Sequence, residues 1–147
     1  MKRIATTAAA LLALSGCGSS DTASFMIDGS EMAVTLERVK AFAWSEEWDL
    51  YLTVRRSPDC QRRHVLKPVV SDAPKVELFT PEPYVFIVRQ GKRWYVTELK
   101  TCQLQSFKEA PPEPGRPAGV FLAKDGGLVF VPDPRARPAA PAQPAAQ

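Results

Sequence analysis

The sequence YVFIVRQGKRWYVTEL, residues 84–99, decides the fold class of this chain. Two runs rich in β-branched and aromatic residues flank the dipeptide Gln90-Gly91, and a glycine between two such runs favours a tight turn. The stretch therefore predicts an antiparallel β-hairpin.

With Gln90-Gly91 at the tip, Ile87 lies opposite Trp94 and Val85 opposite Val96. These four apolar residues share one face of the hairpin, which we expect to pack on the core. The other face is amphipathic and is predicted to be partly covered or to form a binding wall; it carries Tyr84, Phe86, Arg93, Tyr95 and Thr97.

Similar signals recur on both sides of this hairpin. Asp28-Gly29 separates two apolar runs, and residues 48–55 alternate apolar and polar side chains as a half-buried strand does. A last hairpin is predicted over residues 120–131. Prolines recur between residues 58 and 117 and exclude a long helix there. We therefore predict an all-β fold, a small antiparallel sandwich or partly open barrel.

The beginning of the chain joins the charged pair Lys2-Arg3, an apolar run over residues 4–14 and the sequence Leu14-Ser15-Gly16-Cys17. The apolar run is too short to cross a bilayer as a stable helix. This combination resembles the signal peptide of bacterial lipoproteins. The resemblance implies that a diacylglycerol is attached to the Cys17 thiol, that the chain is cut just before Cys17, and that the new amino terminus is acylated.

The resemblance also implies in which membrane the protein is located. In the sorting pattern of enteric lipoproteins, an aspartate after the lipidated cysteine favours the inner membrane. Gly18 and Ser19 follow Cys17 here, so the outer membrane is the expected location.

The lipoprotein resemblance and the composition divide the chain into four segments. Residues 1–16 are the predicted signal peptide, and the small polar residues 17–23 are a predicted flexible tether. Residues 24–131 form the predicted all-β domain. Residues 132–147 are mostly Pro, Ala and Gln, which bury little, so we expect a disordered, polyproline-like tail.

The lipoprotein resemblance accounts for the odd number of cysteines. With Cys17 lipidated, Cys60 and Cys102 remain as one pair in an oxidising compartment, where a disulfide is expected. Closing this loop of about 43 residues restricts the unfolded chain by roughly 4 kcal/mol.

The balance of charge and the missing motifs exclude several function classes. Without Lys2 and Arg3 the chain has 17 Lys and Arg against 16 Asp and Glu, whereas nucleic-acid-binding domains are normally strongly basic. No nucleophile elbow, zinc-protease motif or phosphate-binding glycine loop is present. We therefore expect no nucleic-acid partner, no metal or other cofactor, and no enzyme; hydrolysis at His64 and Asp59 is the minor alternative.

Positive charge is concentrated around Cys60. If Cys60 is bonded, the loop is held, and guanidinium groups on a held loop can grip phosphate or carboxylate through paired hydrogen bonds. The alternative is a solvated loop whose arginines pair with acids such as Asp59. Lys92-Arg93 is a second basic spot. The candidate anion-binding residues are Arg55, Arg56, Arg62, Arg63, His64 and Lys67.

Together these features predict a lipid-anchored, non-enzymatic binding or accessory protein of the bacterial envelope, with its domain in the periplasm. The lipid supplies the membrane contact, and a further partner is expected among envelope proteins, peptidoglycan and lipopolysaccharide. The alternative is a small-molecule carrier, in which Trp44, Trp48 and Trp94 line an apolar cavity.

Overall fold

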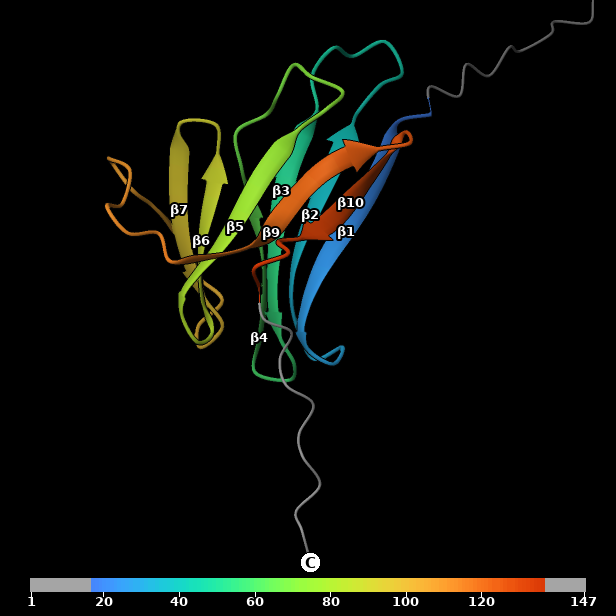
Figure 1. Ribbon diagram of the computed structural model, residues 1–147. Helices are drawn as coiled ribbons and strands as arrows, with labels where there is room; N and C mark the ends of the chain where they lie inside the picture. Colours follow the sequence, from blue (N-terminus) through green and yellow to red (C-terminus); the bar gives the residue numbers. More distant parts are fainter. Residues whose placement is uncertain (1–16, 137–147) are drawn as a thin grey trace, which may run out of the picture.

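The computed structural model describes residues 17–136, and this part of the chain forms two antiparallel sheets and no helix (Figure 1). The first sheet contains four strands in chain order: β1 (Ser19–Asp28), β2 (Met32–Lys40), β3 (Asp49–Arg56) and β4 (Cys60–Val65). The second sheet, in the order β10-β9-β5-β6-β7-β8, contains β5 (Lys75–Glu82), β6 (Val85–Gln90), β7 (Arg93–Glu98), β8 (Leu104–Ser106), β9 (Arg116–Lys124) and β10 (Gly127–Pro132). The sandwich prediction is confirmed.

The core lies between the two sheets and follows from the period-two pattern of the strands. Val34 and Leu36 of β2 lie opposite Val54 and Leu52 of β3, so all four side chains point to the same side and are fully buried. The facing sheet contributes Val76, Leu78, Val88 and Phe121, which are equally buried. Burial of this shared face is the main stabilisation of the fold.

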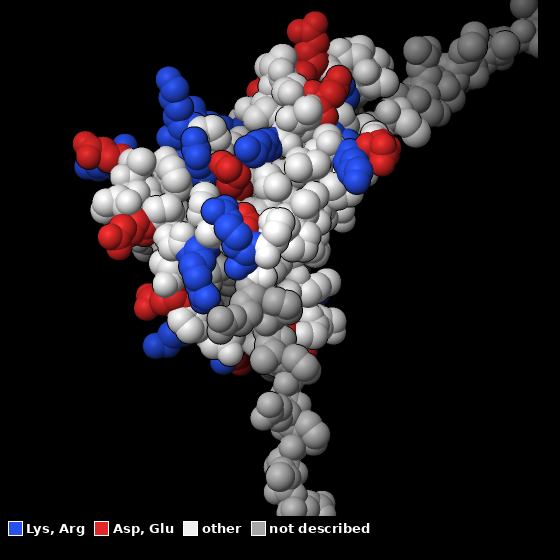
Figure 2. Space-filling model, viewed as in Figure 1, with Lys and Arg blue, Asp and Glu red and all other residues white. Residues whose placement is uncertain are grey.

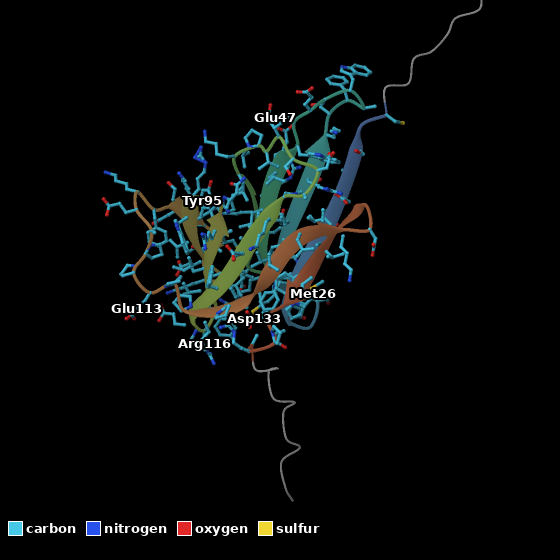
Figure 3. All side chains as sticks on the ribbon, turned by 45° about the horizontal axis from the view of Figure 1, so that its top comes forward. Met26, Glu47, Tyr95, Glu113, Arg116 and Asp133 are labelled. Atoms are coloured by element: carbon cyan, nitrogen blue, oxygen red, sulfur yellow. A yellow bond between two sulfur atoms is a disulfide. The ribbon has the colours of Figure 1, made fainter. Side chains whose placement is uncertain are left out.

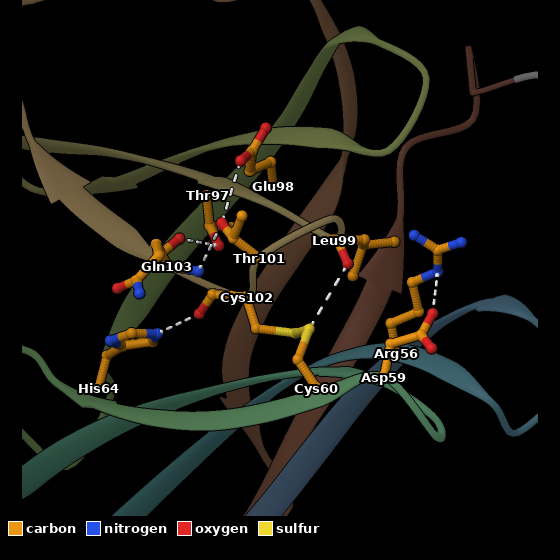
Figure 4. The surroundings of a disulfide bond; sticks show 10 residues. All are labelled: Arg56, Asp59, Cys60, His64, Thr97, Glu98, Leu99, Thr101, Cys102 and Gln103. Atoms are coloured by element: carbon orange, nitrogen blue, oxygen red, sulfur yellow. Dashed lines mark hydrogen bonds and ion pairs between the residues drawn. A yellow bond between two sulfur atoms is a disulfide. The ribbon is translucent and has the colours of Figure 1, made fainter.

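A disulfide joins the two sheets at one edge of the sandwich. Cys60 begins β4, and Cys102 lies in the turn between β7 and β8; their Cα atoms are 6.0 Å apart. The predicted bond between these two cysteines is confirmed (Figure 4).

At the opposite edge, β1 lies beside β10 and a single carboxylate connects them. The carboxylate of Asp21 accepts a hydrogen bond of 2.8 Å from the backbone N–H of Leu128. The edges of both sheets are therefore fastened to one another, although the strands do not close into a barrel.

The predicted tether is wrong for most of its length, because β1 begins at Ser19 and its first five residues pair with residues 36–40 of β2. The sequence of this part is small and polar, but Asp21 and Ala23 point inward, where Asp21 has ionic partners and Ala23 joins the core. Only Gly18 separates Cys17 from the first strand residue.

The 84–99 hairpin exists, but its register and its buried face differ from the prediction. Gly91 and Lys92 form the tip, with Gly91 at a φ of 59°, so Ile87 lies opposite Val96 rather than Trp94. The core face is the one with Phe86 and Thr97. Both faces of β6 are apolar, so the alternation there does not distinguish inside from outside.

The face that we predicted to lie outside packs inside the sandwich, and its polar Thr97 finds a hydrogen-bond partner there. The hydroxyl of Thr97 donates to the backbone carbonyl of Gln103 at 2.6 Å. The face that we predicted to be buried, with Ile87 and Trp94, lies on the outer side of the second sheet. There Trp94 packs against Phe79, and Ile87 is still buried because neighbouring side chains cover it.

The chain leaves the sandwich at the end opposite to its start. β1 and β10 run in the same sense along neighbouring edges, from Ser19 and Gly127 at one end to Asp28 and Pro132 at the other (Figure 1). The predicted signal peptide and residues 137–147 of the predicted tail lie outside the described residues; Asp133 and Arg135 form a salt bridge just after β10. No helix long and apolar enough to span a membrane is found in residues 17–136.

Candidate anion-binding cleft

The basic residues around Cys60 are not brought together as one site. Arg55 lies opposite Gln61, and Arg63 lies opposite Thr53. These positions alternate with the buried Leu52 and Val54 of β3, so both arginines point to the outer face of the first sheet. Both Nε and Nη2 of Arg63 donate to the carboxylate of Glu37, and the guanidinium lies over the ring of Tyr51 at 3.5 Å.

The other predicted residues near Cys60 lie on the opposite side of β3 and β4 or at their turn. Arg56 forms a salt bridge of 3.3 Å with Asp59, and Arg62 is exposed on the edge strand. The Nε2–H of His64 donates to the backbone carbonyl of Cys102 at 2.7 Å, beside the disulfide (Figure 4). That ring nitrogen therefore has a structural role.

Lys67 belongs to a different group of cations, at the end of the sandwich where β6 and β7 meet. A hollow of about 630 Å³ lies there between the hairpin tip, the segment after β4 and the segment after β8. Its basic lining residues are Lys67, Lys92, Arg93 and Lys108. We call this hollow the basic cleft. Figure 2 shows Lys and Arg side chains over this corner, at the upper left.

Two hydrogen bonds hold the segments that line the basic cleft against the hairpin. The side-chain amide of Gln90 donates to the carbonyl of Lys67 at 2.6 Å, which fixes the segment after β4. The backbone N–H of Phe107 donates to the carbonyl of Trp94 at 2.8 Å, which fixes the segment after β8. The four cations therefore come from three segments that are fastened together.

Three aromatic residues, Trp94, Tyr95 and Phe107, line the basic cleft together with Val65 and Pro68. Burial raises the pKa of the Tyr95 phenol above its usual range, although the charge of Arg93 opposes this effect. Tyr95 therefore stays neutral at physiological pH, and its hydroxyl donates to Gln90 at 3.4 Å. Figure 3 labels Tyr95 in this region.

The basic cleft has no acidic lining residue, and among the described residues none of its four cations forms an ion pair. Three other hollows of the surface each contain a carboxylate, from Asp28 in one and from Glu82 and Glu98 in the other two. Uncompensated cations beside aromatic rings can hold a phosphate or carboxylate, with Arg93 able to bind it through two parallel hydrogen bonds.

Parts of this cleft are indicated by local sequence signals. Lys92-Arg93 stands out as a basic hairpin tip and Lys67 as part of the Cys60 cluster, but their proximity depends on how the two sheets pack. Lys108 carries no local signal, since it follows the three-residue strand β8 in a polar segment.

A second polar group, buried at the same end of the sandwich, was missed in the sequence. Arg38 is 3% exposed and pairs with Asp21 at 2.6 Å. Its Nη1 donates to the carbonyl of Asp72, and its Nη2 donates to that of Gly126 as well as to Asp21. Burial would raise the pKa of Asp21, but the hydrogen bonds from Arg38 and Leu128 and the Arg38 charge outweigh it and lower the pKa.

The three tryptophans do not share a cavity. Trp48 is buried over Arg38 and donates its indole N–H to Asp72 at 2.9 Å, a bond that lowers the pKa of that carboxyl. Trp44 is exposed in the β2–β3 loop, and Trp94 lies beside Phe79 and the basic cleft.

Comparisons of the chain with protein-family models, with curated proteins and with solved structures give no match. Within residues 17–136, no group of three or more His, Cys, Asp or Glu side chains is placed to hold a metal ion. The chemistry of the basic cleft is therefore the main guide to function.

Proposed function

We propose that this protein is a lipid-anchored, non-enzymatic binding module of the bacterial envelope. Cys17 carries the lipid, the sandwich faces the periplasm, and the basic cleft binds an anionic group of another envelope component. The observation that carries the binding role is the gathering, around an aromatic-lined cleft, of four cations that form no ion pair within residues 17–136.

The geometry favours this function over the carrier alternative. A carrier needs an enclosed apolar cavity. The three tryptophans point to different surroundings, and the hollow of about 740 Å³ lined by Phe25, Tyr84 and Phe86 is open at the surface. His64 and Asp59, the residues of the hydrolytic alternative, are engaged by the Cys102 carbonyl and by Arg56 respectively.

Anchoring is tested by replacing Cys17 with alanine. We expect the wild-type chain to enter the detergent phase and its amino-terminal peptide to carry the mass of the lipid, because the thiol is the attachment point. The Cys17→Ala variant should remain an uncut precursor without that mass. A wild-type amino terminus that is neither cut nor modified contradicts the anchor.

The basic cleft is tested by charge reversal, with Lys92→Glu and Arg93→Glu in one chain and a photo-crosslinking residue in place of Phe107. In intact cells we expect crosslinked products from the parent protein and their loss from the double variant, since two attractive charges become repulsive. Electrophoresis and mass spectrometry measure the products.

The matched control makes the same change of charge away from the basic cleft, with Lys100→Glu and Arg116→Glu. Both residues are exposed and lie at the opposite end of the sandwich. The control should keep its products. Equal loss in both variants means that net charge alone governs the contact, which contradicts a site at the basic cleft.

A further inference from the structure

We propose that Phe42 and Trp44 insert into the lipid–water interface beside the anchor, so that the end of the sandwich carrying the β2–β3 loop rests on the membrane. The inference rests on the proposed lipidation of Cys17. It adds a second, non-covalent membrane contact and fixes which end of the domain faces the bilayer.

Phe42 and Trp44 form an exposed aromatic pair. Their rings are stacked, with centroids 5.1 Å apart and planes 12° from parallel, and the residues are 51% and 71% exposed. Neither residue belongs to the hydrophobic core of the described chain. Large aromatic side chains left together in water mark a surface for a partner.

The position of this pair relative to Cys17 identifies the partner. Gly18 lies against the end of β2: a Cβ on Gly18 would be 2.6 Å from the carbonyl oxygen of Lys40 and 2.8 Å from that of Ala41. Ala41 is the residue before Phe42. A lipid on Cys17 and the aromatic pair therefore project from the same small area of the surface.

The β2–β3 loop presents the pair on a fixed base. The backbone of Trp48, at the far side of the loop, exchanges two hydrogen bonds with Val69, and its indole is held by Asp72. The backbone N–H of Ser45 donates to the carbonyl of Phe42 and closes a turn. In Figure 3 the loop with Glu47 lies at the same end as the start of β1, while Met26 and Asp133 lie at the other end.

Apolar burial rather than charge is the expected driving force. Indole is favoured at the membrane interface because its ring is apolar and its N–H can still reach headgroups and water. Glu46 and Glu47 follow Trp44 in the same loop, so the pair itself is not part of a basic patch that would attract anionic headgroups. Val70, which follows the residue that pairs with Trp48 at the base of the loop, is also an exposed apolar residue, at 74%.

Fluorescence of the mature, lipidated chain in vesicles tests the inference. The vesicles contain zwitterionic phospholipid with bromine atoms near the top of the acyl chains, which quench a tryptophan in contact with them. The signal of Trp44 is the difference between the wild type and Trp44→Phe, which keeps an aromatic ring at the position. We expect this difference signal to be quenched and to stay quenched in high salt.

A reporter at the opposite end provides the matched control. Tyr84 is 53% exposed there, and Tyr84→Trp in the Trp44→Phe background moves the exposed tryptophan across the molecule. We expect no quenching of this added residue. Quenching equal to that of Trp44 means that the domain lies on the membrane without a preferred end, which overturns the inference.

The anchor and the aromatic contact fail in different ways. If the amino-terminal peptide carries the lipid but Trp44 is not quenched, the aromatic contact is overturned and the anchor stands. If the peptide carries no lipid, both are overturned. If Trp44 becomes shielded at higher protein concentration without vesicles, the pair is a contact between two copies of the chain, and the inference is overturned.

Discussion

Arg38 shows how one charged residue is kept inside the sandwich. It occupies an inward position of β2, two residues after Leu36, yet its guanidinium donates to Asp21, to two backbone carbonyls and lies over the ring of Trp48. A buried charge with such a complete set of partners is tolerated, whereas the same charge with a partner removed is strongly destabilising. The pair also holds the start of β1 against the rest of the fold.

Replacing Asp21 with asparagine therefore has a large expected effect. We expect a loss of about 3 kcal/mol in the free energy of unfolding at neutral pH, at the low end for a broken buried pair because Asp21 is partly exposed. Urea unfolding measures the loss. Glu31→Gln, which removes the charge of an exposed carboxylate with no ion pair, is the control and should change the stability little.

The same pair makes a prediction for pH. The pKa of Asp21 is lower in the folded chain than in the unfolded chain, so its contribution is complete above the unfolded pKa near 4 and declines as the pH falls through the lower folded value. The wild type should lose stability across that acid range more steeply than Asp21→Asn. Parallel curves for the two proteins contradict the assigned role of the pair.

Among the structural elements, β4 and the turn between β7 and β8 depend most on a covalent link. β4 is the edge strand of its sheet, and the Cys60–Cys102 bond together with the His64 hydrogen bond attaches it to the second sheet. The chain between the two cysteines includes β5 and β6. The bond therefore restricts a long loop of the unfolded chain.

The double variant Cys60→Ser with Cys102→Ser should lose roughly 4 kcal/mol of unfolding free energy, the loop-entropy value for a loop of this length. Urea unfolding without reductant measures it. Reductant should bring the wild type to the same stability and leave the double variant unchanged. Wild-type stability that resists full reduction contradicts this role of the bond.

How well the elements follow from the sequence depends on whether the two faces of a strand differ in polarity. Leu50, Leu52 and Val54 alternate with polar residues, so the inner face of β3 is predictable and is confirmed. β6 is apolar on both faces, so its orientation is decided by the facing sheet. The strand at the start of β1 was missed because the partner of Asp21 is Arg38, which lies 17 residues away.

For the whole molecule, the disulfide is predictable from a count of cysteines, but the basic cleft is not predictable from local charge. Most of the arginines near Cys60 have partners or point to different faces once the sheet forms. The cleft combines Lys67 with Lys92, 25 positions further along the chain, and with Lys108. Such a site is set by packing between distant segments, which the sequence does not display.

The proposed membrane contacts and the end of β10 lie at opposite ends of the sandwich. Cys17 and the Phe42–Trp44 pair lie at one end of the sandwich, the basic cleft opens at the hairpin tip of that same end, and the chain leaves β10 at the other. The cleft is thus close to the expected membrane surface, and the segment after Pro132 starts on the side away from it.

The short link between β1 and the proposed anchor at Cys17 has a mechanical consequence. A force between the lipid and anything held at the far end of β10 pulls on Ser19 and Pro132 in opposite directions, along the axes of their strands. The hydrogen bonds between β1 and β2 lie across this pull and share the load together, instead of opening one after another like a zipper. With the proposed lipid on Cys17, the sandwich is therefore expected to resist tension away from the membrane, because the strand next to the anchor is loaded in shear.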